Sequence, residues 1–187
     1  MNAAPALAYQ PRKTPIQERS AATVEAITEA TIQVLLTVGL DHLTTTRVAE
    51  RAGVSVGTLY QYYPNKQSLL FALLDNHMVK VSEAVEMACN DARGKPLLAM
   101  VSDVVQRYVD AKTMRINIST ALYQISADIG GPAIVKRSVE RSRKALAAMI
   151  KTAPDIAFPP DKFAIELMFA AMGGATASFL GRARRLQ

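Results

Sequence analysis

The chain has 187 residues, of which half are hydrophobic and a fifth charged, and its formal net charge is +6. This length and balance indicate a globular protein of one or two domains and exclude a disordered or fibrous chain. One cysteine, Cys89, and two histidines, His42 and His77, exclude a disulfide framework and a zinc site of the His/Cys type, so we expect no metal and no cofactor. The basic excess favours a polyanionic partner.

The sequence favours a cytoplasmic protein without a membrane span. Residues 1–15 contain no apolar run of the kind that opens a secreted chain. The longest uncharged stretch, Leu167–Gly181, is shorter than the ~20 residues that cross a bilayer. The single cysteine also fits a reducing compartment.

The spacing of apolar residues predicts helices in the first half of the chain, after an N-terminal arm. Three prolines and scattered alanines predict that residues 1–15 form a disordered arm. A first helix is expected over Gln17–Val38, ended by Gly39. Two short helices follow, at Thr45–Ala52 and Val56–Tyr62.

The second half also reads as helices separated by glycine and proline. Asn65 is expected to cap a long helix over Lys66–Ala92. Further apolar faces predict helices beginning near Pro96, Ile118, Pro132 and Asp161. No alternating strand pattern occurs, so the predicted fold class is all-α. We expect three parts: the arm at 1–15, a first helical domain at 16–65, and a second helical domain at 66–187.

The segment Leu43–Leu70 carries the functional signal. Thr44 or Thr45 can cap a short helix, and Gly53 can adopt the positive φ that a tight turn requires. Ser55 can then cap a second short helix. This is the helix-turn-helix arrangement, in which the second helix enters the major groove of DNA.

The second short helix has side chains suited to reading DNA. Gly57 allows a close backbone approach, and Gln61 can bind adenine through two hydrogen bonds. Thr58 can reach a phosphate or a thymine methyl group, while Tyr60 and Tyr62 can donate to phosphates. Lys66 follows in the first turn of the next helix, where a phosphate would balance its charge.

These residues resemble the DNA-binding domain of the TetR family of bacterial transcriptional regulators. The likeness lies in Thr44-Thr45, Ala52–Ser55, Gly57–Tyr60 and the helix led by Lys66; Tyr63 departs from the phenylalanine usual at its position. The resemblance implies that a set of ten residues contacts DNA: Thr45, Arg47, Ser55, Val56, Gly57, Thr58, Tyr60, Gln61, Tyr62 and Lys66.

The resemblance also implies that residues 16–65 form the helix-turn-helix DNA-binding domain. Residues 66–187 would then form a helical regulatory and dimerisation domain, with a homodimer interface and a ligand pocket. Two C-terminal helices per subunit would form the dimer interface, and Pro132–Ile150 and Phe163–Leu180 lie in the matching places. Apolar and aromatic residues of the middle helices are candidates to line a pocket for a small apolar or amphipathic effector: Met78, Met114, Ile118, Tyr123 and Phe169, with Met87, Met100 and Tyr108 as further members. Each of them is also an ordinary core residue of a helical domain.

The predicted function is a dimeric, sequence-specific DNA-binding regulator, a repressor that binds a palindromic operator and is released by a small effector. The alternative is a DNA-binding regulator or nucleoid-type protein controlled by a protein partner, without a small-molecule ligand. A sealed C-terminal core would favour that alternative. An enzyme is disfavoured, and no catalytic residue is assigned, because the sequence contains no phosphate-binding loop, metal motif or nucleophile elbow.

Overall fold

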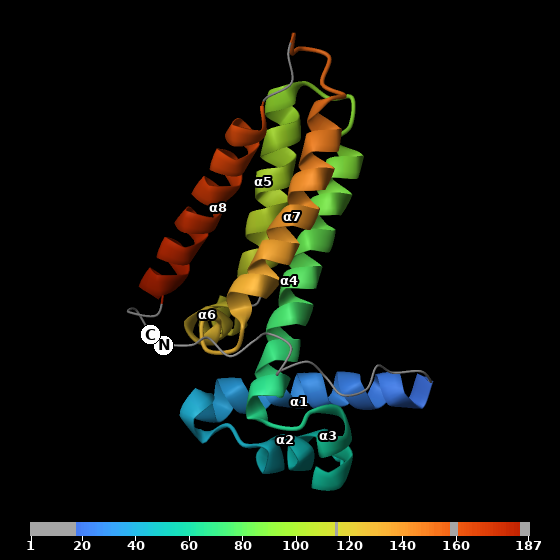
Figure 1. The fold of residues 1–187 in the computed structure, drawn as a ribbon, viewed down its shortest axis with the longest axis vertical. Coiled ribbons are helices and arrows are strands. Elements are labelled where there is room, and N and C mark those ends of the chain that lie inside the picture. The colour runs from blue at the N-terminus through green and yellow to red at the C-terminus, as the bar shows by residue number, and fades with distance from the viewer. Residues whose placement is uncertain (1–17, 115, 158–160, 184–187) are drawn as a thin grey trace. The chain divides into compact units, whose positions relative to one another are not determined.

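The computed structural model describes residues 18–114, 116–157 and 161–183, and most of these residues lie in helices (Figure 1). The predicted arm with Arg12 and Lys13 lies outside these ranges. Eight helices are described: α1 Glu18–His42, α2 Thr45–Ala52, α3 Val56–Tyr62, α4 Lys66–Asp91, α5 Leu97–Thr113, α6 Ile116–Ile125, α7 Gly131–Ile150 and α8 Lys162–Ala183. The all-α prediction is confirmed, and α2 and α3 have the predicted bounds.

The chain divides into two compact units. The first contains Met1–Asn76 and Ala121–Ala133, and the second contains His77–Thr120 and Ile134–Gln187. The first unit therefore holds α1, α2, α3, the beginning of α4, the second half of α6 and the first residues of α7.

Helix α1 forms the apolar base of the first unit. It packs against α2, and it buries Ile27, Ala30 and Leu35. Gly39 interrupts its helical geometry with φ 75° and ψ 175°, at the position where the sequence predicted the helix to end. The stretch Ser20–His42 is long and apolar enough by composition to cross a membrane, with a mean hydropathy of 1.3. A core helix passes the same test, and 33% of the window is buried, so this one helix by itself does not indicate a membrane span.

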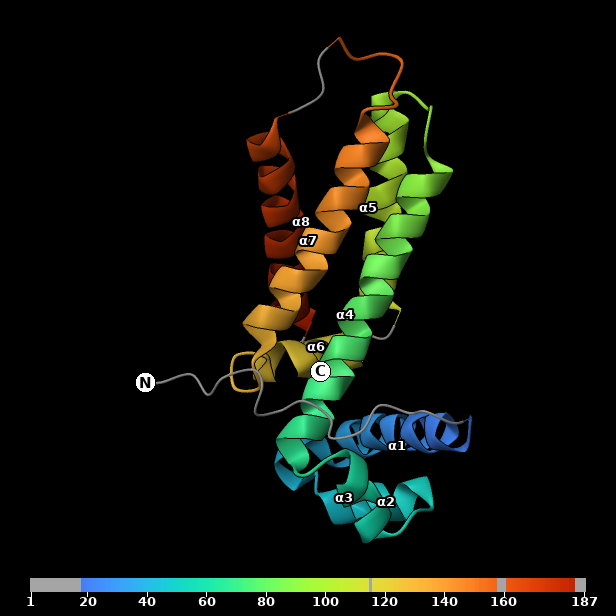
Figure 2. The same cartoon turned by 45° about the vertical axis from the view of Figure 1, so that its right-hand side comes forward.

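The second unit is built around an apolar core that four helices share. Helix α4 contributes Val85 and Cys89, α5 contributes Met100, and α7 contributes Leu146. Ile165 of α8 closes the same cluster. Figures 1 and 2 show α5 and α7 running beside the C-terminal half of α4.

Three of the later helix starts differ slightly from the sequence prediction. Helix α5 begins at Leu97, with Pro96 as its cap residue, and α6 begins at Ile116 instead of Ile118. Helix α7 begins at Gly131, one residue before the predicted Pro132. Asp161 caps α8 as predicted, because its Oδ1 accepts the Ala164 amide at 2.7 Å.

Candidate nucleic-acid interface

A tight left-handed turn joins α2 to α3. Gly53 has φ 68° and ψ 29°, a conformation that glycine adopts at little cost. Its amide donates to the Glu50 carbonyl at 3.2 Å, and the Val54 amide donates to the Ala49 carbonyl at 3.0 Å. The turn predicted from Gly53 is confirmed.

Side-chain caps fix the start of each short helix. The Thr44 hydroxyl accepts the Arg47 amide at 3.3 Å, which makes Thr44 the cap of α2. The Ser55 hydroxyl accepts the Thr58 amide at 2.9 Å and caps α3. Each such cap contributes about 1 kcal/mol of stability. The first turn of α3 is therefore held in place before any ligand binds.

Buried side chains fix one side of α3 against α2. Leu59 of α3 and Val48 and Ala49 of α2 expose essentially none of their surface. Tyr63, at the end of α3, is also buried, and its hydroxyl has a hydrogen-bond partner in Thr28 of α1. Burial raises the pKa of this phenol, so it stays neutral at physiological pH. The hydroxyl that distinguishes this chain from the usual phenylalanine is thus satisfied within the unit.

The opposite side of α3 is open to solvent. Gly57, Tyr60 and Gln61 are exposed, as is the capping Ser55. The remaining residues predicted to contact DNA on this helix are half-buried: Val56, Thr58 and Tyr62. A helix with one anchored and one exposed face is the geometry that a groove-reading helix requires.

Hydroxyl groups on and around α3 are oriented by one another. The Tyr60 hydroxyl lies 3.2 Å from that of Thr45, so two predicted DNA-contacting residues from different helices meet. The Ser55 and Thr58 hydroxyls are 2.8 Å apart. The Tyr62 hydroxyl donates to Ser20 of α1 at 3.4 Å. These contacts restrict the rotamers that the side chains would present to a phosphate.

Lys66 connects α4 to the end of α1. Its ammonium donates to the Leu40 carbonyl at 2.7 Å and is half-buried. An ammonium has three donors, so further donors remain for a phosphate. Asn65 and Ser68 cap α4 reciprocally: the Ser68 amide donates to Asn65 Oδ1 at 2.8 Å, and the Asn65 amide donates to the Ser68 hydroxyl at 3.2 Å. The Asn65 cap predicted from the sequence is confirmed.

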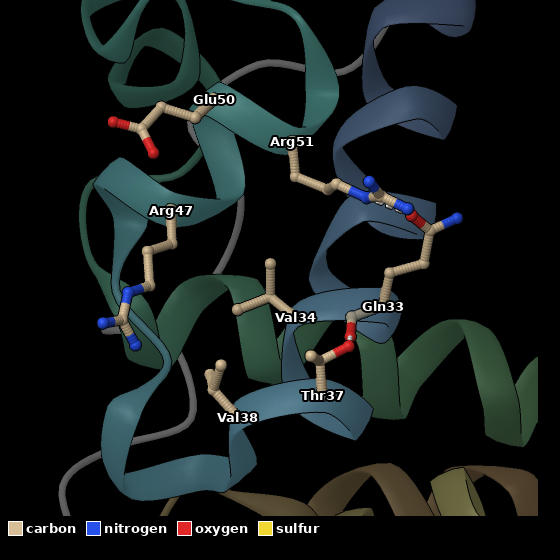
Figure 3. A pocket seen from close by; sticks show the side chains of 7 residues that line it. All are labelled: Gln33, Val34, Thr37, Val38, Arg47, Glu50 and Arg51. Carbon is tan, nitrogen blue, oxygen red and sulfur yellow. Dashed lines mark hydrogen bonds between the residues drawn. The ribbon is translucent and has the colours of Figure 1, made fainter.

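An open groove of about 560 Å³ runs between α1 and α2 (Figure 3). Val34 and Val38 of α1 line it, and the other side carries Arg47, Glu50 and Arg51 of α2. Figure 3 shows Arg51 directed toward Gln33, to whose side-chain oxygen it donates at 2.5 Å.

Two arginines of α2 donate hydrogen bonds to residues of α1, and the sequence alone did not indicate these contacts. Arg47, predicted to contact DNA, donates to the His42 carbonyl at 2.9 Å, so its guanidinium is held near the end of α1. The Arg51–Gln33 contact was not predicted, because nothing in the sequence indicates which face of α1 meets α2.

The residues predicted to line a ligand pocket do not form one set. Met78 and Ile118 are buried, and Phe169 packs partly buried against the core of the second unit. Met114 exposes 82% of its surface and Tyr123 exposes 45%. Both side chains therefore lie outside the buried core, Met114 at the end of α5, and their place in a ligand pocket stays a prediction.

The further pocket candidates divide in the same way. Met87 is exposed on α4 and lies outside the buried core. Met100 is fully buried in the core, and Tyr108 is partly buried and packs against the same core. In the described ranges, no group of three or more metal-ligating side chains is positioned to hold a metal ion.

Helix α8 exposes an apolar surface. Phe163, Leu167 and Phe179 expose 70%, 59% and 53% of their surfaces. Small residues between them are exposed as well: Ala170, Ala171, Gly174 and Ala175. A helix that is apolar on its solvent side is typical of an interaction surface.

Two protein-family models match the sequence of this chain. A family model described as bacterial regulatory proteins, tetR family, matches residues 27–73. A second model, described as the tetracyclin repressor-like C-terminal domain, matches residues 96–187. The chain belongs to the TetR family. It is therefore a DNA-binding transcriptional regulator with an N-terminal helix-turn-helix domain and a C-terminal helical domain, as the sequence predicted.

Solved structures share the fold along most of the chain. The fatty acid degradation regulator FadR from Bacillus halodurans matches 91% of this chain and 87% of its own, with a TM-score of 0.68 and 15% identity. A TetR family regulator from Marinobacter aquaeolei matches with a TM-score of 0.64 and 21% identity over 90% of this chain and 86% of its own. At such identities the likeness shows the fold alone.

Curated relatives match over a shorter stretch. The nucleoid occlusion factor SlmA of Pasteurella multocida is 34% identical over 74 residues, which is 37% of this chain and 37% of SlmA. The class C tetracycline repressor of Escherichia coli is 43% identical over 51 residues, or 27% of this chain and 23% of the repressor. The matched stretches thus span well under half of these relatives.

Proposed function

We propose that this TetR-family regulator is a cytoplasmic repressor that binds an inverted-repeat operator as a homodimer and is released by a small effector. The observation that carries the proposal is α3, whose buried side is anchored by Leu59 and whose exposed side presents Gly57 and Gln61. Sequence would be read by Gln61 and the first turn of α3, and phosphates would be bound by the surrounding hydroxyls and Lys66.

Dimerisation supplies what one subunit lacks. Residues 1–66 contain six Lys or Arg and five Asp or Glu, so a single domain gains little from general attraction to DNA. Two subunits double the phosphate contacts and require two half-sites at once. The exposed apolar face of α8, with Phe163, Leu167 and Phe179, supports pairing through α7 and α8.

The second unit is the place for the effector. Its core contains adaptable or aromatic side chains, among them Met100, Tyr108 and Phe169. A structural neighbour, LfrR from Mycobacterium smegmatis, was solved in complex with proflavine; it matches with a TM-score of 0.56 and 23% identity over 89% of this chain and 87% of its own. We expect the effector to favour a dimer whose α3 helices are misspaced for the operator, with α4 linking the two units.

Selection from random DNA duplexes tests the proposal. The purified protein should enrich one inverted repeat at ~150 mM salt, where nonspecific binding is weak. A mass measurement on the free protein should give twice the mass of the 20.3 kDa chain. Unpatterned DNA retention, or a monomer at micromolar concentration, would contradict the proposal.

A second candidate function rests on the similarity to SlmA. Two nucleoid occlusion factors, from Pasteurella multocida and Mannheimia succiniciproducens, match at 34% and 31% identity over 74 residues. In this alternative a protein partner controls the regulator, and no small molecule is needed. Pull-down with the operator-bound protein as bait, with free protein as the control, separates the two: a partner specific to the bound form favours the alternative.

A further inference from the structure

The buried face of α5 is apolar along most of its length and ends in a lysine. Met100, Val104, Tyr108 and Lys112 follow one another at intervals of four residues and therefore share one face of the helix. Met100 and Val104 are fully buried, and Lys112 exposes only 4% of its surface. The face that begins as core thus ends in a buried ammonium.

Lys112 has weak partners inside the second unit. Its ammonium donates to the Met78 sulfur at 3.4 Å, and a thioether is a poor acceptor. It also lies 6.0 Å from the centre of the Tyr108 ring, at the outer limit of a cation–π contact. Among the described residues, no carboxylate forms an ion pair with it.

The polar groups beside Lys112 are neutral. Ser119, itself buried, donates its hydroxyl proton to the Lys112 carbonyl at 2.8 Å. Ser119 must then accept the hydrogen bond from His77 Nε2, which lies 3.2 Å away. Burial, with the nearby Lys112 and Lys80, lowers the pKa of His77 to about 4, so the imidazole is neutral at pH 7. Among the described residues, the recorded partners of Lys112 supply hydrogen bonds but no negative charge.

An ammonium in this position is costly for the free protein. Burial lowers the pKa of Lys112 to about 8, so most molecules still carry the charge at pH 7. A buried charge without a counter-ion destabilises the fold, and such groups are concentrated at functional sites. A methionine at this position would fill similar space without that cost.

We propose that the Lys112 ammonium is the anchor for the anionic head group of the effector, and that the effector is an amphipathic carboxylic acid. This inference rests on the proposed ligand-responsive function and assigns its ligand class. One ammonium balances one negative charge, which favours a carboxylate over a phosphate with nearly two charges. The apolar part of the acid packs beside Met78 and Tyr108, the two side chains that contact the ammonium, and His77 with its partner Ser119 lies next to the head group.

Matched acids and amides test this assignment. The probes are decanoate, 4-phenylbutyrate and naphthalene-1-acetate, each beside its primary amide, added to the full chain at pH 7. Binding is measured by thermal shift and calorimetry for the wild type, Lys112→Met and Lys151→Met. Lys151 is exposed after α7, so its variant removes the same charge from a solvated position.

We expect at least one acid to bind the wild type about tenfold more tightly than its amide, since the amide lacks the charge. The preference should persist in Lys151→Met and disappear in Lys112→Met, whose melting temperature without ligand should equal or exceed that of the wild type. If Lys112→Met does not fold, Lys112→Gln is measured in its place. A panel without any acid preference overturns the inference, and so does a preference that survives removal of the Lys112 charge.

Operator binding separates this inference from the proposed function. A wild type that selects an operator but shows no acid preference refutes the Lys112 assignment alone. A wild type that prefers acids through Lys112 but selects no operator refutes the repressor function and leaves the ligand site standing.

Discussion

Replacing Gly57 by alanine should separate stability from DNA binding. Gly57 is the second residue of α3, and it is absent from the glycines with positive φ. A Cβ built at this position would meet the Ser55 hydroxyl oxygen at 3.7 Å, an ordinary van der Waals contact. The free protein therefore accepts the methyl group without strain. Because alanine loses less conformational entropy than glycine in a helix, Gly57→Ala should raise the free energy of unfolding by about 0.5–1 kcal/mol.

The same methyl group should weaken operator binding. Gly57 is exposed on the face of α3 that we place against DNA, where the backbone itself must come close. Displacement of the helix would cost each subunit about 1.4 kcal/mol, which is tenfold in affinity. A dimer that carries the change twice would lose up to about a hundredfold. The variant is thus expected to be more stable and to bind less tightly.

Gly53→Ala is the matched control. Its added Cβ would touch nothing within 4 Å, but its φ of 68° is unfavourable for alanine. This variant should lose about 1–2 kcal/mol of stability from backbone strain alone. Urea unfolding measures both free energies, and fluorescence anisotropy on the selected operator measures both affinities. A Gly57→Ala protein that is stabilised and binds like the wild type would refute the placement of this face against DNA. A Gly57→Ala protein that is less stable than the wild type would refute the strain-free helical conformation of Gly57 in α3.

Other substitutions test separate parts of the account. Gln61→Ala should leave stability unchanged and relax preference at one base-pair position by about 1–3 kcal/mol, measured by competition with operator variants; an equal loss on all sequences would exclude base reading. Lys66→Ala should weaken binding to every duplex and lower the slope of log affinity against log salt concentration by about 1 per subunit. Loss of its hydrogen bond to Leu40 should also cost about 1–2 kcal/mol of stability. An unchanged slope would exclude a phosphate contact. Burial lowers the pKa of His77 to about 4, whereas in the unfolded chain it stays near 6.5. Between these values only the unfolded chain binds the proton, so the free energy of unfolding should rise with pH. His77→Gln should remove this contribution to the slope of the unfolding free energy against pH.

The helix-turn-helix unit could be predicted because its determinants are local. Gly53 is needed for a left-handed turn, and Ser55 and Asn65 cap the helices that follow them. Each of these effects depends on residues within four positions, so the sequence alone identifies them. The bounds of α2 and α3 follow directly from such signals.

Burial outside the helix-turn-helix could not be predicted with the same certainty. Met114 and Tyr123 have the apolar character of pocket residues, yet their exposure depends on how neighbouring helices rotate. Lys112 was missed for the converse reason, because a lysine near the end of a helix is usually solvated. Its interval of four from Tyr108 was the available signal, and it becomes meaningful once the buried face of α5 is known.

Hydroxyl-radical footprinting of the selected operator tests the central claim most directly. If two subunits each place α3 in a major groove, the protected positions should form two equivalent patches related by two-fold symmetry. They should be separated by about one helical turn of 10 base pairs or a multiple of it. A single asymmetric patch, or uniform protection along the duplex, would contradict a dimeric regulator that reads DNA with α3.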